Sequence, residues 1–387
     1  MKNRRIQRRP KNKEVSSLPG SKPGRIIIVL LSLFLLMFAG CSPENVIPPQ
    51  PDGNDKESRI LIGLSIDSYV QERWQRDRDI FVARAKELGA EVLVQNANNE
   101  HQEQMKQVKY LIDQGIDILV IIPHDAEASA EAVRMANKAG IKVISYDRLV
   151  RNGGVDLYIS FDNVRVGEIK AEALVEKVPK GNYLIIKGAP TDYNTEMLYQ
   201  GYMSVLREYI RNGDIRIVGE TSAIDWAYED AFKCVEEILE DGVEINAIIA
   251  SNDTLAHAAI EALSEKRLAG KVAVVGQDAD LAACQRVVEG TQLMTAYKPI
   301  DKLAKAAAEA AVKMVKGEDL DTNETIFDGT YRVPYYKIEP IAVTVDNMMD
   351  TIVKDGFHRL EDIFINVPKD RWRSEEHTSE LQSRTLI

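Results

Sequence analysis

The feature that most constrains the fold of this chain is a series of short apolar runs, each of which stops at an Asp or Asn. The first run lies within 59–68, and five later ones end at His124-Asp125, Asp147-Arg148, Asp192-Tyr193-Asn194, Asn252-Asp253 and Gln277-Asp278. A strand that is apolar throughout is buried on both faces, which is typical of a parallel sheet covered by helices. Ligands of such sheets bind at the carboxyl ends of the strands. Carboxylates, carboxamides and basic groups gathered there predict a ligand made mostly of hydroxyl groups, such as a sugar.

The chain alternates predicted strands and helices from residue 59 to about residue 299. Helices at 103–114 and 126–139 each end at a Gly before the next strand begins. Strands are expected at 60–66, 92–95, 118–123 and 143–147, and in a second series at 183–187, 215–218, 247–250, 272–275 and 293–297. Because two such series exceed one sheet, the prediction is an α/β protein with two doubly wound parallel-sheet lobes.

Three extended segments are expected to connect the lobes, at 159–162, 297–300 and roughly 331–340. This assignment places 59–161 and 299–331 in an N-terminal lobe, and 162–298 and 332–372 in a C-terminal lobe. Three crossings would form a hinge, and the cleft between the lobes would face the strand ends of both.

The first forty residues have the charge and hydropathy of a secretory signal. Residues 1–25 contain nine Lys or Arg and one Glu, and 26–39 is an apolar run of fourteen residues interrupted only by Ser32. That run is short for a membrane span but suits the core of a signal peptide. Its end, Phe38-Ala39-Gly40-Cys41, resembles a bacterial lipoprotein signal with lipid on Cys41, although Phe38 stands where Leu is usual. The alternative is an uncleaved signal anchor. Either one places the body outside the cytoplasm, on a tether formed by 41–58.

Charge and motifs exclude several function classes. The net charge is −11 although the first 25 residues are basic, so the body is acidic and nucleic acid is not its expected ligand. Hydrolase, zinc-protease and nucleotide-loop motifs are absent, and the five histidines have no metal spacing, so no enzyme activity, cofactor or metal is predicted. Cys234 and Cys284 lie in helical patterns, where packing is the ordinary role, and a disulfide between them stays open. Residues 373–387 resemble a translated sequencing adapter and are set aside.

Seven segments carry a more specific signal. They are 66–81 (IDSYVQERWQRDRDIF), 120–123 (VIIP), 146–148 (YDR), 158–163 (YISFDN), 250–253 (ASND), 276–281 (GQDADL) and 297–300 (YKPI). Together they resemble the D-xylose-binding members of the periplasmic sugar-binding family of bacterial ABC uptake systems, over about 59–358. The resemblance implies a type I periplasmic-binding-protein fold whose lobes close on D-xylose or a related pentose.

The resemblance also implies a set of sugar contacts, carried over position by position. They are Arg73, Trp74, Asp147, Arg148, Asn194, Trp226, Asn252, Asp278 and Lys298. A pyranose has C–H faces and a rim of hydroxyls that both donate and accept, so aromatic faces and planar polar groups suit it. Tyr193 departs from the family pattern, in which a second Asn is expected, and this residue leaves the shape of the Asn194 loop open.

Each proposed contact has a structural alternative. Trp74 lies on the apolar stripe of a helix and could belong to the core, whereas Trp226 lies in a loop and is expected to contribute little to the core. Asp147 and Asp278 could cap the segments that follow them. Arg73 and Arg148 could neutralise those carboxylates, a role that is compatible with ligand contact.

Two functions remain open from the sequence. The chain could deliver the sugar to a membrane ABC permease, or it could report the closed state to a membrane sensor histidine kinase. A sugar-responsive repressor would share the two-lobed fold, but residues 1–57 contain a signal segment in place of a helix-turn-helix.

Overall fold

The computed structural model describes residues 59–71, 73–320, 322, 324–369 and 372. The predicted signal (1–40), the lipidated Cys41, the tether (41–58) and the adapter-like tail (373–387) lie outside the described residues. Within the described part of the chain, no helix combines the length and the hydropathy that a bilayer crossing requires.

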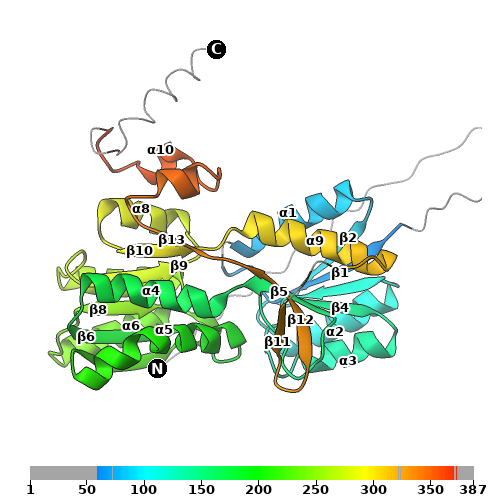
Figure 1. Cartoon of the computed structure of the whole chain (residues 1–387), viewed down its shortest axis with the longest axis horizontal. Helices are drawn as coiled ribbons and strands as arrows, with labels where there is room; N and C mark the ends of the chain where they lie inside the picture. Colours follow the sequence, from blue (N-terminus) through cyan, green and yellow to red (C-terminus); the bar gives the residue numbers. More distant parts are fainter. Residues whose placement is uncertain (1–58, 72, 321, 323, 370–371, 373–387) are drawn as a thin grey trace, which may run out of the picture. The chain divides into compact units, whose positions relative to one another are not determined.

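The first lobe is built on a seven-stranded sheet with the order β11-β12-β5-β4-β3-β1-β2 (Figure 1). Its strands are β1 (Leu61–Ile66), β2 (Glu91–Asn96), β3 (Ile118–Ile121), β4 (Lys142–Tyr146), β5 (Leu157–Phe161), β11 (Glu324–Phe327) and β12 (Arg332–Ile338). All neighbouring pairs are parallel except β11 with β12.

Helices cover both faces of this sheet, as the apolar runs predict. Helices α1 (Arg73–Glu87) and α9 (Ile300–Lys316) pack together, and α2 (His101–Asp113) packs with α3 (Ala130–Lys138). The alternation along β3 shows the two faces: Ile118 and Val120 join the cluster of α1 and α9, whereas Leu119 and Ile121 join the cluster of α2 and α3. The strand β3 is therefore buried on both faces and has no polar residue before it ends.

The second lobe is built on a six-stranded sheet with the order β13-β10-β9-β8-β6-β7. Its strands are β6 (Gly181–Lys187), β7 (Ile215–Ser222), β8 (Ala247–Ala250), β9 (Ala273–Gln277), β10 (Met294–Tyr297) and β13 (Ile341–Val343), of which only β13 is antiparallel to its neighbour. Its helices are α4 (Asn163–Lys177), α5 (Tyr193–Asn212), α6 (Tyr228–Glu240), α7 (Asp253–Glu265), α8 (Leu281–Glu289) and α10 (Leu360–Ile363), with short helices η1 (Ile224–Trp226) and η2 (Met349–Val353).

Helices α4 and α5 approach each other closely because glycines face each other at their contact. A β-carbon at Gly167 would collide with the carbonyl of Leu198, and one at Gly201 would collide with the carbonyl of Val164. The close approach fixes the first turn of α5, which carries Asn194, against the first turn of α4.

Two of the predicted crossings are strands of the first sheet. Residues 157–161 form β5 between β4 and β12, and Arg332–Ile338 forms β12, which pairs with β5. The predicted boundary between 331 and 332 is therefore wrong, because the chain reaches the second sheet only at β13. The strand β12 alternates exposed and buried residues and contains Pro334. This pattern is typical of a half-exposed strand near the edge of a sheet, not of a segment that connects two lobes.

Candidate functional site

The strand ends of the two lobes meet at one pocket. Eight of the nine predicted contacts line it, and Gln71, Asp192 and Gln277 line it with them; the eight are Arg73, Trp74, Asp147, Arg148, Asn194, Trp226, Asp278 and Lys298. Its free volume is about 10 Å³, close to that of a single water position, so side chains of both lobes fill the space. A larger groove of about 460 Å³ lies elsewhere between loops of both lobes and is lined by none of the nine.

Arg73 is the centre of the ion pairs on the first-lobe side. Its guanidinium lies 2.9 Å from Asp147 and 3.3 Å from Asp77, and Asp77 also accepts a hydrogen bond from the hydroxyl of Tyr146. Burial opposes the charge of Asp147, but Arg73, Lys298 and Arg148 outweigh burial and hold the pKa of Asp147 below its ordinary value. Asp147 therefore stays ionised and can accept hydrogen bonds from hydroxyls.

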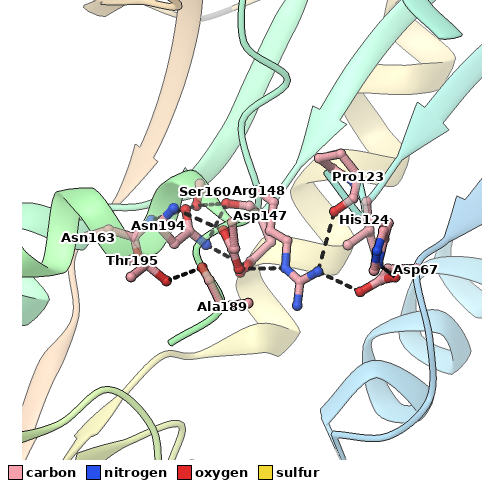
Figure 2. A network of polar contacts seen from close by, with 12 residues as sticks. Asp67, Pro123, His124, Asp147, Arg148, Ser160, Asn163, Ala189, Asn194 and Thr195 are labelled. Atoms are coloured by element: carbon pink, nitrogen blue, oxygen red, sulfur yellow. Dashed lines mark hydrogen bonds and ion pairs between the residues drawn. The ribbon is translucent and has the colours of Figure 1, made fainter. Parts of the chain in front are cut away.

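Arg148 forms a second network that reaches across the two lobes (Figure 2). Its Nη1 lies 2.6 Å from Asp67 at the end of β1, and its Nε lies 2.7 Å from Asp192 in the second lobe. His124 Nδ1 lies 2.8 Å from the same Asp67. The hydrogen bond to Asp67 raises the pKa of His124 despite partial burial. These contacts connect three strand ends of one lobe to the first turn of α5 in the other.

Asn194 provides a further contact between the lobes. Its Nδ2 donates to the carboxylate of Asp147 at 3.2 Å, and its Oδ1 accepts from Asn163 Nδ2 at 3.0 Å, as Figure 2 shows. Asp192 caps the same helix by accepting from the backbone N–H of Asn194. The cap therefore fixes the position of Asn194 beside Asp147.

The second-lobe side of the pocket is formed by Asp278 and Lys298. Lys298 Nζ lies 2.8 Å from Asp278 Oδ1, and Arg73 of the first lobe lies 3.5 Å from the same oxygen. Both Asp147 (φ 60°) and Asp278 (φ 93°) have left-handed backbones directly after their strands. Such backbones are strained for a non-glycine residue and cluster at functional sites.

Both pocket tryptophans also belong to hydrophobic clusters. Trp74 is 2% exposed and packs beneath the guanidinium of Arg73, whose Cζ lies 4.3 Å from the ring centroid. Trp226 is 7% exposed, and its ring lies against Gly188 so closely that a β-carbon there would collide with it. The expectation that Trp226 contributes little to the core is therefore wrong. A loop position without helical periodicity can still be buried when it folds back over a neighbouring strand end.

Asn252 is the predicted contact that does not line the pocket. It is the N-cap of α7, where its side chain accepts from the backbone N–H of Leu255 at 2.9 Å. Three lining residues were not predicted: Gln71, Asp192 and Gln277. Asp192 and Gln277 lie where predicted strands end in polar residues. Both would have been found if every polar residue at such a strand end had been taken as a candidate contact.

Neither a metal-binding group nor a disulfide is found within the described residues. No group of three His, Cys, Asp or Glu there has a metal-binding arrangement. Cys234 and Cys284 are both free, so no disulfide joins them.

Comparison with known proteins gives the class of this protein. Residues 62–319 match the periplasmic binding protein domain family, and the chain belongs to this family. The chain is 47% identical over 306 residues to the D-xylose-binding periplasmic protein of Haemophilus influenzae, covering 79% of this chain and 92% of that protein. It is 46% identical to the D-xylose-binding periplasmic protein of Escherichia coli, covering 78% of this chain and 91% of that one.

Solved structures agree with the fold. A carbohydrate transporter solute-binding protein from Chloroflexus aurantiacus, in complex with D-glucose, superposes with a TM-score of 0.74 at 28% identity, over 79% of this chain and 98% of that one. An ABC transporter solute-binding protein from Clostridium phytofermentans with bound β-D-glucose has a TM-score of 0.72 at 28% identity, over 81% and 100%. The two sheets are therefore the two lobes of a type I periplasmic binding protein.

Proposed function

We propose that this chain binds D-xylose in the pocket between its lobes and delivers the sugar to an ABC permease. The observation that carries the proposal is the identity of 46–47% to two D-xylose-binding periplasmic proteins, over more than nine-tenths of each. The same resemblance is carried by the residues that line the pocket, since Arg73, Asp147, Arg148 and Asp278 all lie there.

The chemistry of the pocket suits a pentopyranose. Asp147 and Asp278 would accept hydrogen bonds from ring hydroxyls, and Arg73 and Lys298 would donate to hydroxyl oxygens. Among the described residues the indole N–H groups of Trp74 and Trp226 are buried without an acceptor, and a sugar oxygen would supply one. A hydrogen bond to a charged group contributes about 1.5 to 3 kcal/mol, so a few of them account for tight binding.

Sugar entry requires the lobes to separate. The free volume between the side chains is about that of one water, and three contacts close it across the lobes: Arg73 to Asp278, Arg148 to Asp192, and Asn194 to Asp147. We propose that hinge motion at the crossings breaks these contacts, and that the sugar replaces part of them on closure.

A calorimetric sugar panel tests the substrate. The full-length chain, solubilised in detergent, is titrated with D-xylose, D-ribose, L-arabinose and D-glucose. We expect D-xylose to bind most tightly, because a site selective for a pentopyranose excludes the additional CH2OH of a hexose. Tighter binding of D-ribose or D-glucose would reject D-xylose as the substrate.

We further propose that lipid on Cys41 anchors the protein at the outer face of the cell membrane. Labelling of cells with a fatty-acid analogue should mark the protein and should fail in Cys41→Ser. Loss of D-xylose uptake on deletion of the gene would support delivery to a permease. Normal uptake together with loss of a D-xylose-dependent transcriptional response would instead indicate signalling through a sensor histidine kinase.

A further inference from the structure

Lys170 is a fully buried lysine beneath the second-lobe side of the pocket. It lies on α4 with 0% exposure, and its Nζ donates to the carbonyls of Ala250 and Ser251, each at 3.1 Å, and to Gln277 Oε1 at 3.2 Å. Within the described residues no carboxylate forms an ion pair with it; the ring of Tyr202 lies on another side, 5.0 Å from Nζ. A buried ammonium without a carboxylate partner is unusual, because burial of a charge is unfavourable unless hydrogen bonds offset it.

The three acceptors lie at the ends of two neighbouring strands. Ala250 ends β8 and is followed by Ser251 and Asn252, whereas Gln277 ends β9 and precedes Asp278. Gln277 and Asp278 both line the pocket, and Asp278 has a left-handed backbone that needs support from its surroundings. Within the described part of the chain, no other side chain donates to the carbonyls of Ala250 and Ser251 and to Gln277 Oε1.

We propose that Lys170 is a positioning residue for the sugar pocket: its ammonium group fixes the carboxyl ends of β8 and β9 together and so holds Gln277 and Asp278 in the geometry that binds sugar. The inference rests on the proposed sugar-binding function and extends it to a residue that does not line the pocket. It acts through Gln277 and the backbone, not by touching the ligand.

The protonation state of Lys170 makes this role testable. Three acceptors require three N–H donors, which the ammonium has and the neutral amine does not. Burial lowers the pKa of Lys170 to about 7; Asp278 and Asp253 oppose this shift, and Lys298 adds to it. As the pH rises through that value the sugar-free protein loses the third donor. Binding that depends on all three bonds must then weaken, or take up a proton to restore the ammonium.

Binding and stability should respond to pH with opposite signs. The pKa of Lys170 is lower in the folded chain than its ordinary value of 10.5, so the unfolded chain holds more protons between pH 7 and 10.5. The contribution of Lys170 to stability therefore rises with pH in that range. Sugar affinity should fall over the same range, because the sugar-bound form favours the ammonium. A purely structural lysine would show the first trend without the second.

Calorimetry of the full-length chain between pH 6 and 9 tests the proposal, with D-xylose as the probe and two buffers of different ionisation enthalpy. We expect affinity to fall about threefold to tenfold from pH 6 to 9, which is the loss of one hydrogen bond, with proton uptake on binding near pH 8. The side chain introduced by Lys170→Gln has two N–H donors and does not titrate. This variant should therefore lose the fall in D-xylose affinity with pH and the proton uptake that belong to Lys170. The control Lys180→Gln replaces an exposed lysine of the same lobe and should keep both.

The outcomes separate this inference from the proposed function. Wild-type binding of D-xylose that is independent of pH and takes up no proton would overturn the role of Lys170 while leaving the sugar as ligand. An unchanged slope in Lys170→Gln would overturn it as well and would assign the slope to another group, such as His124. Failure of the wild type to bind D-xylose at any pH would reject the proposed function itself. If Lys170→Gln does not fold, His124→Gln separates the two groups: proton uptake on D-xylose binding that persists in His124→Gln supports Lys170, and its loss overturns the role of Lys170.

Discussion

The two lobes build their sides of the pocket by different means. The first lobe uses arginines: Arg73 and Arg148 pair with carboxylates of their own lobe, Asp77, Asp147 and Asp67. The second lobe uses backbone carbonyls and amides held by one buried lysine, Lys170, and Asp278 pairs only with Lys298 in its own lobe among the described residues. Asp147 and Asp67 therefore each keep an arginine of their own lobe when the lobes separate, whereas Asp278 and Asp192 each lose an arginine of the other lobe.

This difference predicts which lobe holds the sugar first. A side whose carboxylates are already fixed by bidentate or charged partners is preorganised and loses little entropy on binding. Asp278 lies 3.5 Å from Arg73 across the lobes, a contact that opening would break. We infer that the first lobe determines how the sugar docks and that the second lobe contributes to closure.

The largest expected effects come from neutralising the two aspartates. Asp147→Asn removes a carboxylate that Arg73, Lys298 and Arg148 keep ionised, so it should lower the free energy of unfolding by about 3 to 5 kcal/mol. Asp278→Asn should instead weaken sugar binding by about 1.5 to 3 kcal/mol with a smaller loss of stability, since Lys298 gains water when the lobes open. Chemical denaturation and titration calorimetry on both variants measure the two quantities. Equal losses of stability would contradict the difference between the lobes.

An effect of similar size is expected at Trp226, which contributes both to the pocket and to the core of the second lobe. Trp226→Ala should lower stability by about 3 to 5 kcal/mol, because the ring packs on Gly188 and joins a buried cluster. It should also weaken sugar binding by about 2 kcal/mol or more. Trp226→Phe keeps an aromatic ring and should recover most of the stability. Unchanged unfolding of the Ala variant would show that the ring contributes only to the ligand.

Strand ends could be predicted from the sequence because a strand that is buried on both faces tolerates small hydroxyls such as Ser65 and Ser145 but carries charged side chains only at its ends. That rule places Asp147, Arg148, Asn194 and Asp278 at the pocket, and all four line it. Asn252 does not line the pocket in this structure, and its Oδ1 caps α7. Its contact with the sugar stays a prediction, since its amide nitrogen takes no part in the cap.

The remaining features depend on packing that the sequence does not show. Lys170 belongs to a helix with neighbouring charged residues, and it is buried by the ends of β8 and β9 together with the ring of Tyr202. The strand β12 follows β11 and α9, far along the chain from its partner β5, so no local pattern indicates their pairing. Long-range contacts of this kind decide both the lobe boundary and the support beneath the pocket.

A smaller effect is expected from pH at His124. Its hydrogen bond to Asp67 raises its pKa in the folded protein, with Asp225 adding to the shift and Arg148 opposing it. The contribution to stability is therefore fully present below the ordinary pKa of about 6.5 and is lost as the pH rises through the folded value. Because the imidazole keeps 15% of its side-chain surface exposed to water, we expect a change below about 1 kcal/mol. Denaturation at pH 5.5 and 8.5 measures it, and His124→Gln should flatten this part of the profile. If His124→Gln leaves the dependence of the free energy of unfolding on pH unchanged, His124 does not contribute to the stability of the first lobe.

The smallest expected effect tests closure alone, at Tyr193. This residue begins α5 in the second lobe, yet its ring packs against the hydrophobic cluster of α2 and α3 in the first lobe. The guanidinium of Arg151, also in the first lobe, lies over the ring with Cζ 4.2 Å from the centroid. Tyr193 stands where the resemblance leads us to expect Asn, and the structure gives the Tyr a contact between lobes that an Asn could not make.

We therefore expect Tyr193→Asn to favour the open state and to weaken D-xylose binding by about 0.5 to 1 kcal/mol, the usual contribution of an exposed cation–π contact. The order of preference among sugars should not change, because Tyr193 does not line the sugar pocket. A matched control is Tyr199→Asn, since Tyr199 makes a similar contact with Lys187 inside the second lobe, 5.2 Å from Nζ to the centroid. Calorimetry gives the affinities, and small-angle scattering without sugar gives the radius of gyration. Equal affinities for the two variants, with no expansion of Tyr193→Asn, would show that closure depends on the ion pairs of the pocket and not on this contact.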